Sequence, residues 1–157
     1  MMPLLGFLLI IIFNLPIYKS TLKILQLADL VRIHIFRLIG TTFLLLGFYQ
    51  ALPSSIALLA GFGDIITAVS SIFVARAIQN NKAYAIKLTW FWNTFGLLDI
   101  LATSATAFIL TKLAIETGSQ GVDALAVFPF CFIPAFAPAT IIFLHLSVYR
   151  KLFTKDA

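Results

Sequence analysis

Apolar stretches long enough to cross a lipid bilayer make up most of this chain of 157 residues, and the connections between them are short. The hydrocarbon core of a bilayer is about 30 Å thick, and an α-helix needs about 20 residues to span it. Only 11% of the residues are charged, whereas a soluble domain has about 25%. The sequence therefore predicts an all-α fold, a polytopic helical membrane bundle whose connections are too short to hold a soluble domain.

We expect the whole chain, residues 1–157, to form a single integral membrane domain. Its core is four predicted transmembrane helices, preceded by a short N-terminal span and by an interfacial amphipathic helix over residues 19–30. The predicted spans cover residues 3–18, 30–52, 54–77, 84–113 and 124–149. The first span could instead be a signal peptide. No basic residue precedes it and no small-residue cleavage site follows it, so we expect the span to be retained.

Basic residues gather on one side of this predicted topology. They lie between spans 1 and 2, around the loop between spans 3 and 4, and after span 5: Lys19, Lys23, Arg32, Arg76, Lys82, Lys87, Arg150, Lys151 and Lys155. The opposite side has Lys112. Because basic residues beside spans favour the cytoplasm, we expect a protein of the cell inner (plasma) membrane, with the N-terminus outside and the C-terminus cytoplasmic.

The same distribution accounts for the net charge of +5, so we expect no nucleic acid as a partner. The expected partners are the lipid bilayer and either further copies of the chain, in a homo-oligomer, or a larger membrane complex.

Two aspartates lie near the middle of predicted spans. Asp64 and Asp99 each lie on a stripe of small residues, which allows neighbouring helices to approach closely. A carboxylate at that depth costs about 2.5–3.5 kcal/mol and is usually paired or lines a pathway. Arg37, which cannot shed its charge, is the expected partner, and Asn93 is placed to hydrogen-bond into the same cluster. The cluster, with His145, either fixes the helices through an ion pair or binds or passes a proton, a cation or a small polar solute.

Span 5 contains three prolines, and Asp123 is a candidate N-cap for its helix. Each of Pro129, Pro134 and Pro138 removes a backbone donor and is expected to bend the helix. Pro134 and Pro138 share one helical face with His145. We interpret this face as a bend that wraps the bundle, with a gate or a cavity wall as the alternative.

The two histidines define a different hypothesis. His34 and His145 lie near the cytoplasmic ends of spans 2 and 5, where they could ligate one b-type haem. The protein would then be a haem- or quinone-linked redox subunit. No other cofactor and no metal is expected, because the single cysteine, Cys131, cannot form a CxxC pair. The sequence contains no recognisable nucleophile–base set and does not favour enzyme activity.

Three strings, LPSSIALLAGFGDIITA, WNTFGLLDIL and FPFCFIPAFAPATIIFLHL, resemble a group of small, uncharacterised bacterial multi-pass membrane proteins. The similarity covers about residues 37–148, and its LP…AGxGD, WN…LLD and IP…P…LH patterns include Asp64, Asn93, Asp99 and His145. The resemblance implies a membrane fold and no particular activity. We expect a small membrane protein that acts through its intramembrane polar cluster, with a redox subunit and a structural subunit of a membrane complex as alternatives.

Overall fold

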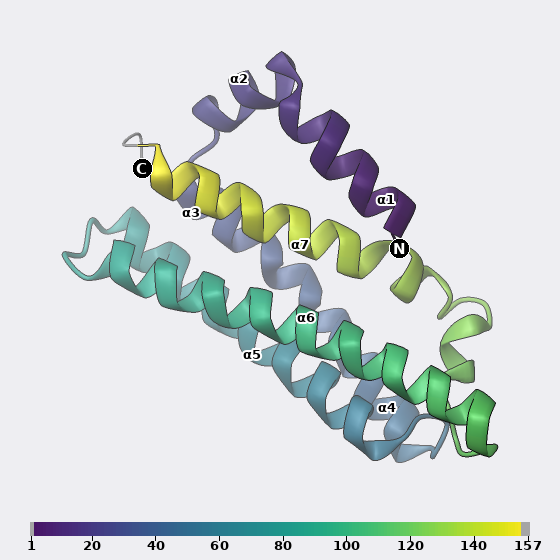
Figure 1. Cartoon of the computed structure of the whole chain (residues 1–157). Helices are drawn as coiled ribbons and strands as arrows, with labels where there is room; N and C mark the ends of the chain where they lie inside the picture. The colour runs from purple at the N-terminus through teal and green to yellow at the C-terminus, as the bar shows by residue number, and fades with distance from the viewer. Residues whose placement is uncertain (1, 155–157) are drawn as a thin grey trace.

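The computed structural model describes residues 2–154, so Lys155, counted above among the basic residues, lies outside the described part. Within residues 2–154 the chain is helical, with short turns and no β-strand (Figure 1). Four helical segments are long and apolar enough to cross a membrane: Leu27–Phe48, Ser54–Gln79, Ala85–Thr117 and Phe132–Phe153. A bent N-terminal pair of helices would make a fifth span. The predicted all-α class, a bundle built on four helices of transmembrane length, is confirmed.

The N-terminal segment is bent where a single span over residues 3–18 was expected. Its first arm consists of α1 (Met2–Gly6), the π-helical η1 (Phe7–Ile11) and the 3-10 turn η2 (Ile12–Asn14). Leu15 is extended, with φ −62° and ψ 138°, because a proline disfavours helical geometry in the residue before it. The next helix, α2 (Pro16–Ile24), leaves the first arm at an angle of 77°. Residues 19–30, predicted as one interfacial helix, are divided between α2, which ends at Ile24, and the next helix, which begins at Leu27.

The second segment changes its winding along its length. It consists of α3 (Leu27–Arg32), the 3-10 helix η3 (Ile33–Gly40) and α4 (Thr41–Phe48). A 3-10 helix has about three residues per turn, so residues three apart lie directly above one another. His34, Arg37 and Gly40 are the buried residues of η3, and they form one row facing the bundle. The predicted span over residues 30–52 thus begins earlier, at Leu27, and ends at Phe48.

The helices α5 (Ser54–Gln79) and α6 (Ala85–Thr117) form an antiparallel hairpin that packs against the second segment (Figure 1). The α5 helix begins directly after Pro53, as expected, while α6 extends beyond the predicted residue 113. Only a narrow stripe of α6 is buried: Ala85, Thr89, Trp92, Asn93, Gly96 and Ile100. This stripe places the side chains of Thr89, Trp92 and Asn93 in the interior.

The last helix, α7 (Phe132–Phe153), begins eight residues later than the predicted span over residues 124–149. Asp123 caps no long helix and begins a four-residue 3-10 turn, η4 (Asp123–Ala126). Pro129 follows this turn, and a proline disfavours helical geometry in the residue before it. Pro134 falls in the first turn of α7, where its missing N–H is not needed, so only Pro138 lies inside the helix. The expected bend from three prolines is therefore reduced to one interior position.

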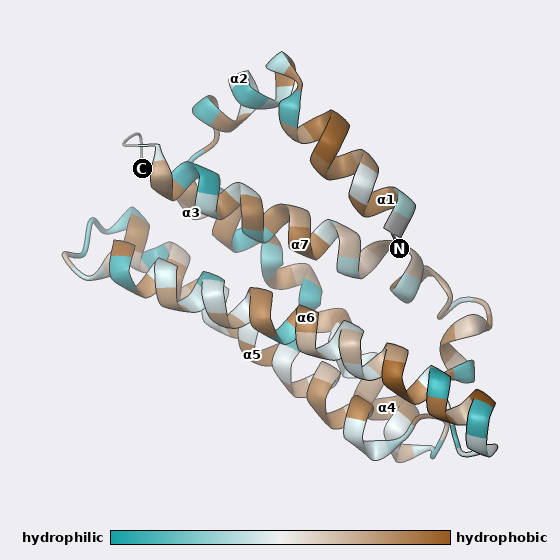
Figure 2. Ribbon diagram, in the orientation of Figure 1, coloured by the Kyte–Doolittle hydropathy of each residue, from teal (hydrophilic) through white to brown (hydrophobic). Residues whose placement is uncertain are grey.

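Hydrophobic residues cover the middle of the helices, and hydrophilic residues gather at the turns and ends (Figure 2). The helix α2, the turn between α5 and α6 and the C-terminal end of α7 lie at the same end of the bundle (Figure 1), which we call the basic end. The basic residues at this end include Lys23, Lys82 and Lys151. The opposite end contains the turn between α4 and α5 and the C-terminal end of α6.

Candidate functional site

Arg37 lies at the centre of the bundle, fully buried, and binds three neighbouring helices. Its Nε and Nη2 atoms both contact Oδ1 of Asp64 on α5, each at 2.7 Å. Nη2 also donates to Oδ2 of Asp99 on α6 at 2.5 Å, and Nη1 donates to the carbonyl oxygen of Gly96 at 3.1 Å. Nη1 further contacts Nε2 of His145 on α7 at 3.2 Å. All three guanidinium nitrogens are thus engaged, and one side chain links η3 to α5, α6 and α7.

Glycines on α5 and α6 provide the space for this cluster. A Cβ atom on Gly63 would overlap the carboxylate of Asp99. A Cβ atom on Gly96 would lie 2.6 Å from Cε1 and 2.8 Å from Nε2 of His145. Small residues let membrane helices approach closely, and here the space they leave is occupied by charged and polar side chains.

His145 is held in one orientation by Asn93. The ring nitrogen Nδ1 of His145 lies 2.8 Å from Oδ1 of Asn93, and Nδ2 of Asn93 donates to the carbonyl oxygen of His145 at 3.1 Å. An amide oxygen only accepts hydrogen bonds, so Nδ1 carries the proton. The other nitrogen, Nε2, is then the acceptor for Nη1 of Arg37. His145 is therefore a neutral imidazole that accepts a hydrogen bond from the guanidinium of Arg37.

The five residues predicted for the polar cluster, Arg37, Asp64, Asn93, Asp99 and His145, are thus brought together in one network. Their roles in binding or transport stay predictions. They meet because Arg37 lies in the buried row of η3, Asn93 lies in the buried stripe of α6, and His145 lies in the second half of α7.

His34 and His145 do not lie as two axial ligands of one haem iron would, and the haem- or quinone-linked redox subunit stays a prediction. Metal–nitrogen bonds are about 2 Å long, and an iron between two imidazoles would separate their ring centroids by roughly 6 Å. The centroids lie 4.4 Å apart, and the rings are inclined at 40° to each other. Both nitrogens of His145 already have partners, in Arg37 and Asn93. Among residues 2–154, no group of three or more His, Cys, Asp and Glu side chains could hold a metal ion.

His34 instead extends the polar cluster toward the basic end. Its Nδ1 atom lies 3.1 Å from the carbonyl oxygen of Leu30, while its Nε2 atom is buried and has no hydrogen-bond partner within residues 2–154. Its ring is perpendicular to that of Trp92, at a centroid distance of 5.0 Å. Trp92 in turn donates from Nε1 to the carbonyl oxygen of Thr67 at 3.1 Å. His34 therefore adds an unpaired polar atom to the interior.

A cavity of about 60 Å³ borders Asp64 on the side that faces away from the basic end of the bundle. Its walls are mostly apolar and come from all four long helical segments and from η4. Two hydroxyl oxygens in the lining, Oγ1 of Thr103 and Oγ of Ser104, are buried and have no hydrogen-bond partner within the described residues. The sequence analysis did not assign these two residues to the site. Thr103 lies four residues, about one helical turn, after Asp99, and this spacing could have predicted its place beside the site.

Fold and site together define a class: a small helical protein in which helices of transmembrane length surround a buried arginine with two carboxylates. The chain belongs to the family described as a domain of unknown function (DUF8737), whose model matches residues 2–153. No curated protein and no solved structure matches it. The expected membership of an uncharacterised family is confirmed at this level, and the family description names no activity.

Proposed function

We propose that this chain is an inner-membrane protein whose interior cluster binds protons and passes them between the two sides of the membrane. The observation that carries the proposal is the charge balance around Arg37. One guanidinium contacts two carboxylates, Asp64 and Asp99, and the neighbouring His145 is neutral. With both carboxylates ionised, the site has one excess negative charge in a region where unbalanced charge is costly. Binding one proton removes that excess.

The groups on either side of the cluster support a route for the proton. On the side away from the basic end, the cavity of about 60 Å³ that reaches Asp64 has room for about two water molecules, at about 30 Å³ of liquid volume each. The free hydroxyl groups of Thr103 and Ser104 are suitable partners for such waters. On the side of the basic end, His145 and His34 continue the chain of polar groups. Rows of carboxylates and histidines are typical of proton relays in membranes.

The size and lining of this cavity favour a proton over a larger solute. A volume of about 60 Å³ with predominantly apolar walls offers few ligands for a hydrated cation or a polar organic molecule. The basic end would face the cytoplasm by the positive-inside rule, so the cavity would lie on the external side of the cluster.

The test is proton flux into liposomes that contain the purified protein and an internal pH-sensitive dye, with a potassium gradient and valinomycin to set the membrane potential. Wild-type protein is expected to carry protons faster than empty liposomes do. Asp64→Asn and Asp99→Asn each remove one of the two carboxylates, and flux should fall to the level of empty liposomes. The matched control is Asp29→Asn, since Asp29 is half-exposed and pairs only with Arg32 at 3.7 Å.

Two results would overturn the proposal. One is a wild-type flux no greater than that of empty liposomes at any imposed potential. The other is a flux that Asp64→Asn and Asp99→Asn leave unchanged although both variants insert and fold.

A structural role is the second candidate, and a specific observation favours it. Every guanidinium nitrogen of Arg37 has a protein partner, and these partners come from three different helical segments. Such a network can fix the register of the helices without moving any charge.

A further inference from the structure

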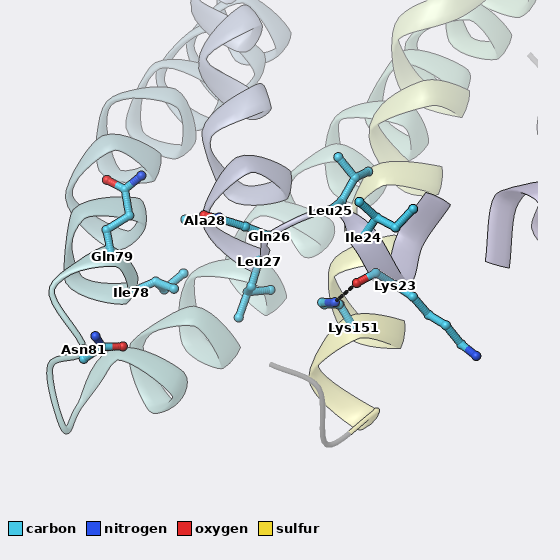
Figure 3. Close-up of a pocket in the computed structure, with 10 residues that line it drawn as sticks. All are labelled: Lys23, Ile24, Leu25, Gln26, Leu27, Ala28, Ile78, Gln79, Asn81 and Lys151. Carbon is cyan, nitrogen blue, oxygen red and sulfur yellow. Dashed lines mark hydrogen bonds between the residues drawn. The ribbon is translucent and has the colours of Figure 1, made fainter. Parts of the chain in front are cut away.

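The helix α2 lies across the basic end of the bundle and is fastened there by the last turns of α7. Nη1 of Arg150 donates to the carbonyl oxygen of Phe13 at 2.7 Å, just before the bend. Nζ of Lys151 donates to the carbonyl oxygen of Leu22 at 3.3 Å. It also donates to the carbonyl oxygen of Lys23 at 3.0 Å (Figure 3). Lys151 is only 4% exposed. Two consecutive cations of α7 therefore hold the backbone just before α2 and in the last turn of α2.

Two cavities adjoin α2 at this end. One, of about 180 Å³, is lined by Lys19, Leu22, Lys23, Arg150 and Thr154. The other is a cleft of about 370 Å³, and its lining includes Lys23, Lys151 and the amide residues Gln26, Gln79 and Asn81 (Figure 3). Figure 3 shows the side chain of Lys23 extending away from Gln79 and Asn81, out of this cleft. Lys19 and Lys23 are four residues apart on one face of α2, so their side chains are neighbours.

Within the described part of the chain, no acidic side chain pairs with the positive charge gathered here. Within residues 2–154, Lys19, Lys23, Arg150 and Lys151 form no salt bridge, since the ion pairs present involve Arg32 and the buried cluster. The carbonyl oxygens bound by Arg150 and Lys151 are dipoles and leave the full charge of both residues in place. Nζ of Lys151 has three donors and uses two of them. Four neighbouring cations that have no salt-bridge partner among residues 2–154 favour an anion between them.

We propose that the cavity between α2 and α7 binds the phosphate group of an anionic phospholipid. A phosphodiester carries one negative charge and several acceptor oxygens. These match the ammonium groups of Lys19 and Lys23 and the guanidinium nitrogens of Arg150 that make no hydrogen bond within residues 2–154. Basic pockets between helices on the cytoplasmic side of a membrane are typical headgroup sites.

Exposed apolar side chains on the same two helices, α2 and α7, favour a lipid as the source of the phosphate. Ile17 and Ile24 of α2 are 72% and 84% exposed, and Phe153 at the end of α7 is 73% exposed. In water these positions would be unfavourable, whereas at the membrane interface they meet acyl chains while the lysines meet headgroups. A free phosphate ion would use the cations alone and leave these apolar side chains without a partner.

The experiment measures lipid binding to the full-length protein in mixed micelles by native mass spectrometry, with phosphatidylglycerol and phosphatidylcholine in equal amounts. The test variant is the double replacement Lys19→Gln with Lys23→Gln. Both side chains are exposed and make no hydrogen bond within the described residues, so the fold should be retained. The matched control is Lys112→Gln at the opposite end of α6. Circular dichroism checks the folding of each.

We expect wild-type protein and Lys112→Gln to retain phosphatidylglycerol in preference to phosphatidylcholine. Each cation near a charged lipid surface contributes about fivefold to affinity, so the double variant should bind phosphatidylglycerol roughly 25-fold more weakly. Equal retention of the two lipids, or a preference unchanged in the double variant, would overturn the proposal. Displacement of the lipid by millimolar inorganic phosphate would assign the site to free phosphate and overturn the lipid source. Because proton flux is not measured here, the outcome is independent of the proposed function.

Discussion

Replacing Arg37 with methionine is the most direct perturbation of the buried cluster. Methionine fills much of the volume of the arginine stem, so the change removes the charge and leaves little cavity. Asp64 and Asp99 then lose their cation, and the carbonyl oxygen of Gly96 and Nε2 of His145 lose a donor. The expected result is a bundle that inserts but is much less stable.

The magnitude follows from the distances in the cluster. Oxygens of the two carboxylates contact Nη2 of Arg37 at 2.7 and 2.5 Å, so they lie at most about 5 Å apart, and two charges at that separation repel by roughly 3 kcal/mol at an effective dielectric constant of about 20. Removal of one partner from a buried ion pair typically destabilises a protein by about 3–5 kcal/mol. We therefore expect Arg37→Met to lower the free energy of unfolding by about 3–5 kcal/mol.

The assay is equilibrium unfolding by sodium dodecyl sulfate in dodecyl maltoside micelles, followed by circular dichroism. Arg32→Met is the control, since Arg32 makes only an exposed pair with Asp29 and its loss should cost about 0–1 kcal/mol. A rescue variant that combines Arg37→Met with Asp64→Asn and Asp99→Asn removes all three charges and should recover most of the lost stability. Wild-type stability in Arg37→Met, or a rescue variant no more stable than the single one, would refute this reasoning.

Two further predictions concern the packing around the cluster. Gly63→Ala should lower the free energy of unfolding by about 1–3 kcal/mol, because its Cβ would overlap the carboxylate of Asp99. Gly6→Ala, which meets no atom within 4 Å, should be close to neutral in the same unfolding assay. Asn93→Leu should cost about 1–3 kcal/mol by leaving Nδ1 of buried His145 without a partner, and a cost no larger than that of a surface substitution would contradict the assigned network.

The polar cluster could be predicted from the sequence because its members obey a rule that is independent of detailed packing. Ionised side chains inside a membrane are costly unless paired, and only Arg37 among the basic residues lay deep enough to pair with Asp64 and Asp99. The helical stripes around both aspartates then fixed which faces meet. The same reasoning placed the four long helices, since apolar length alone is sufficient for their recognition.

The remaining features depend on local backbone geometry or on contacts between distant segments. The 3-10 winding of η3 aligns His34 with Arg37, but nothing in the string IHIFRLIG distinguishes this winding from an ordinary α-helix. The bend before Pro16 and the late start of α7 after Pro129 could have been anticipated, since a proline disfavours helix in the residue before it. The hydroxyls of Thr103 and Ser104, which have no hydrogen-bond partner within the described residues, could not be assigned to the site from the sequence, because the cavity that they line is enclosed by four separate helical segments.

The rescue variant also separates the two roles considered for the cluster. If Arg37, Asp64 and Asp99 serve only to hold the helices in register, a folded variant without their charges should behave as the wild-type protein does in every assay of the intact membrane protein. If the carboxylates bind the proton, the same variant should be stable in micelles and carry no protons in liposomes, because both proton-binding carboxylates have been removed. Under the proton-binding role, this one variant should therefore keep its stability and lose its proton flux. Under the structural role, both its stability and its flux should match those of the wild-type protein.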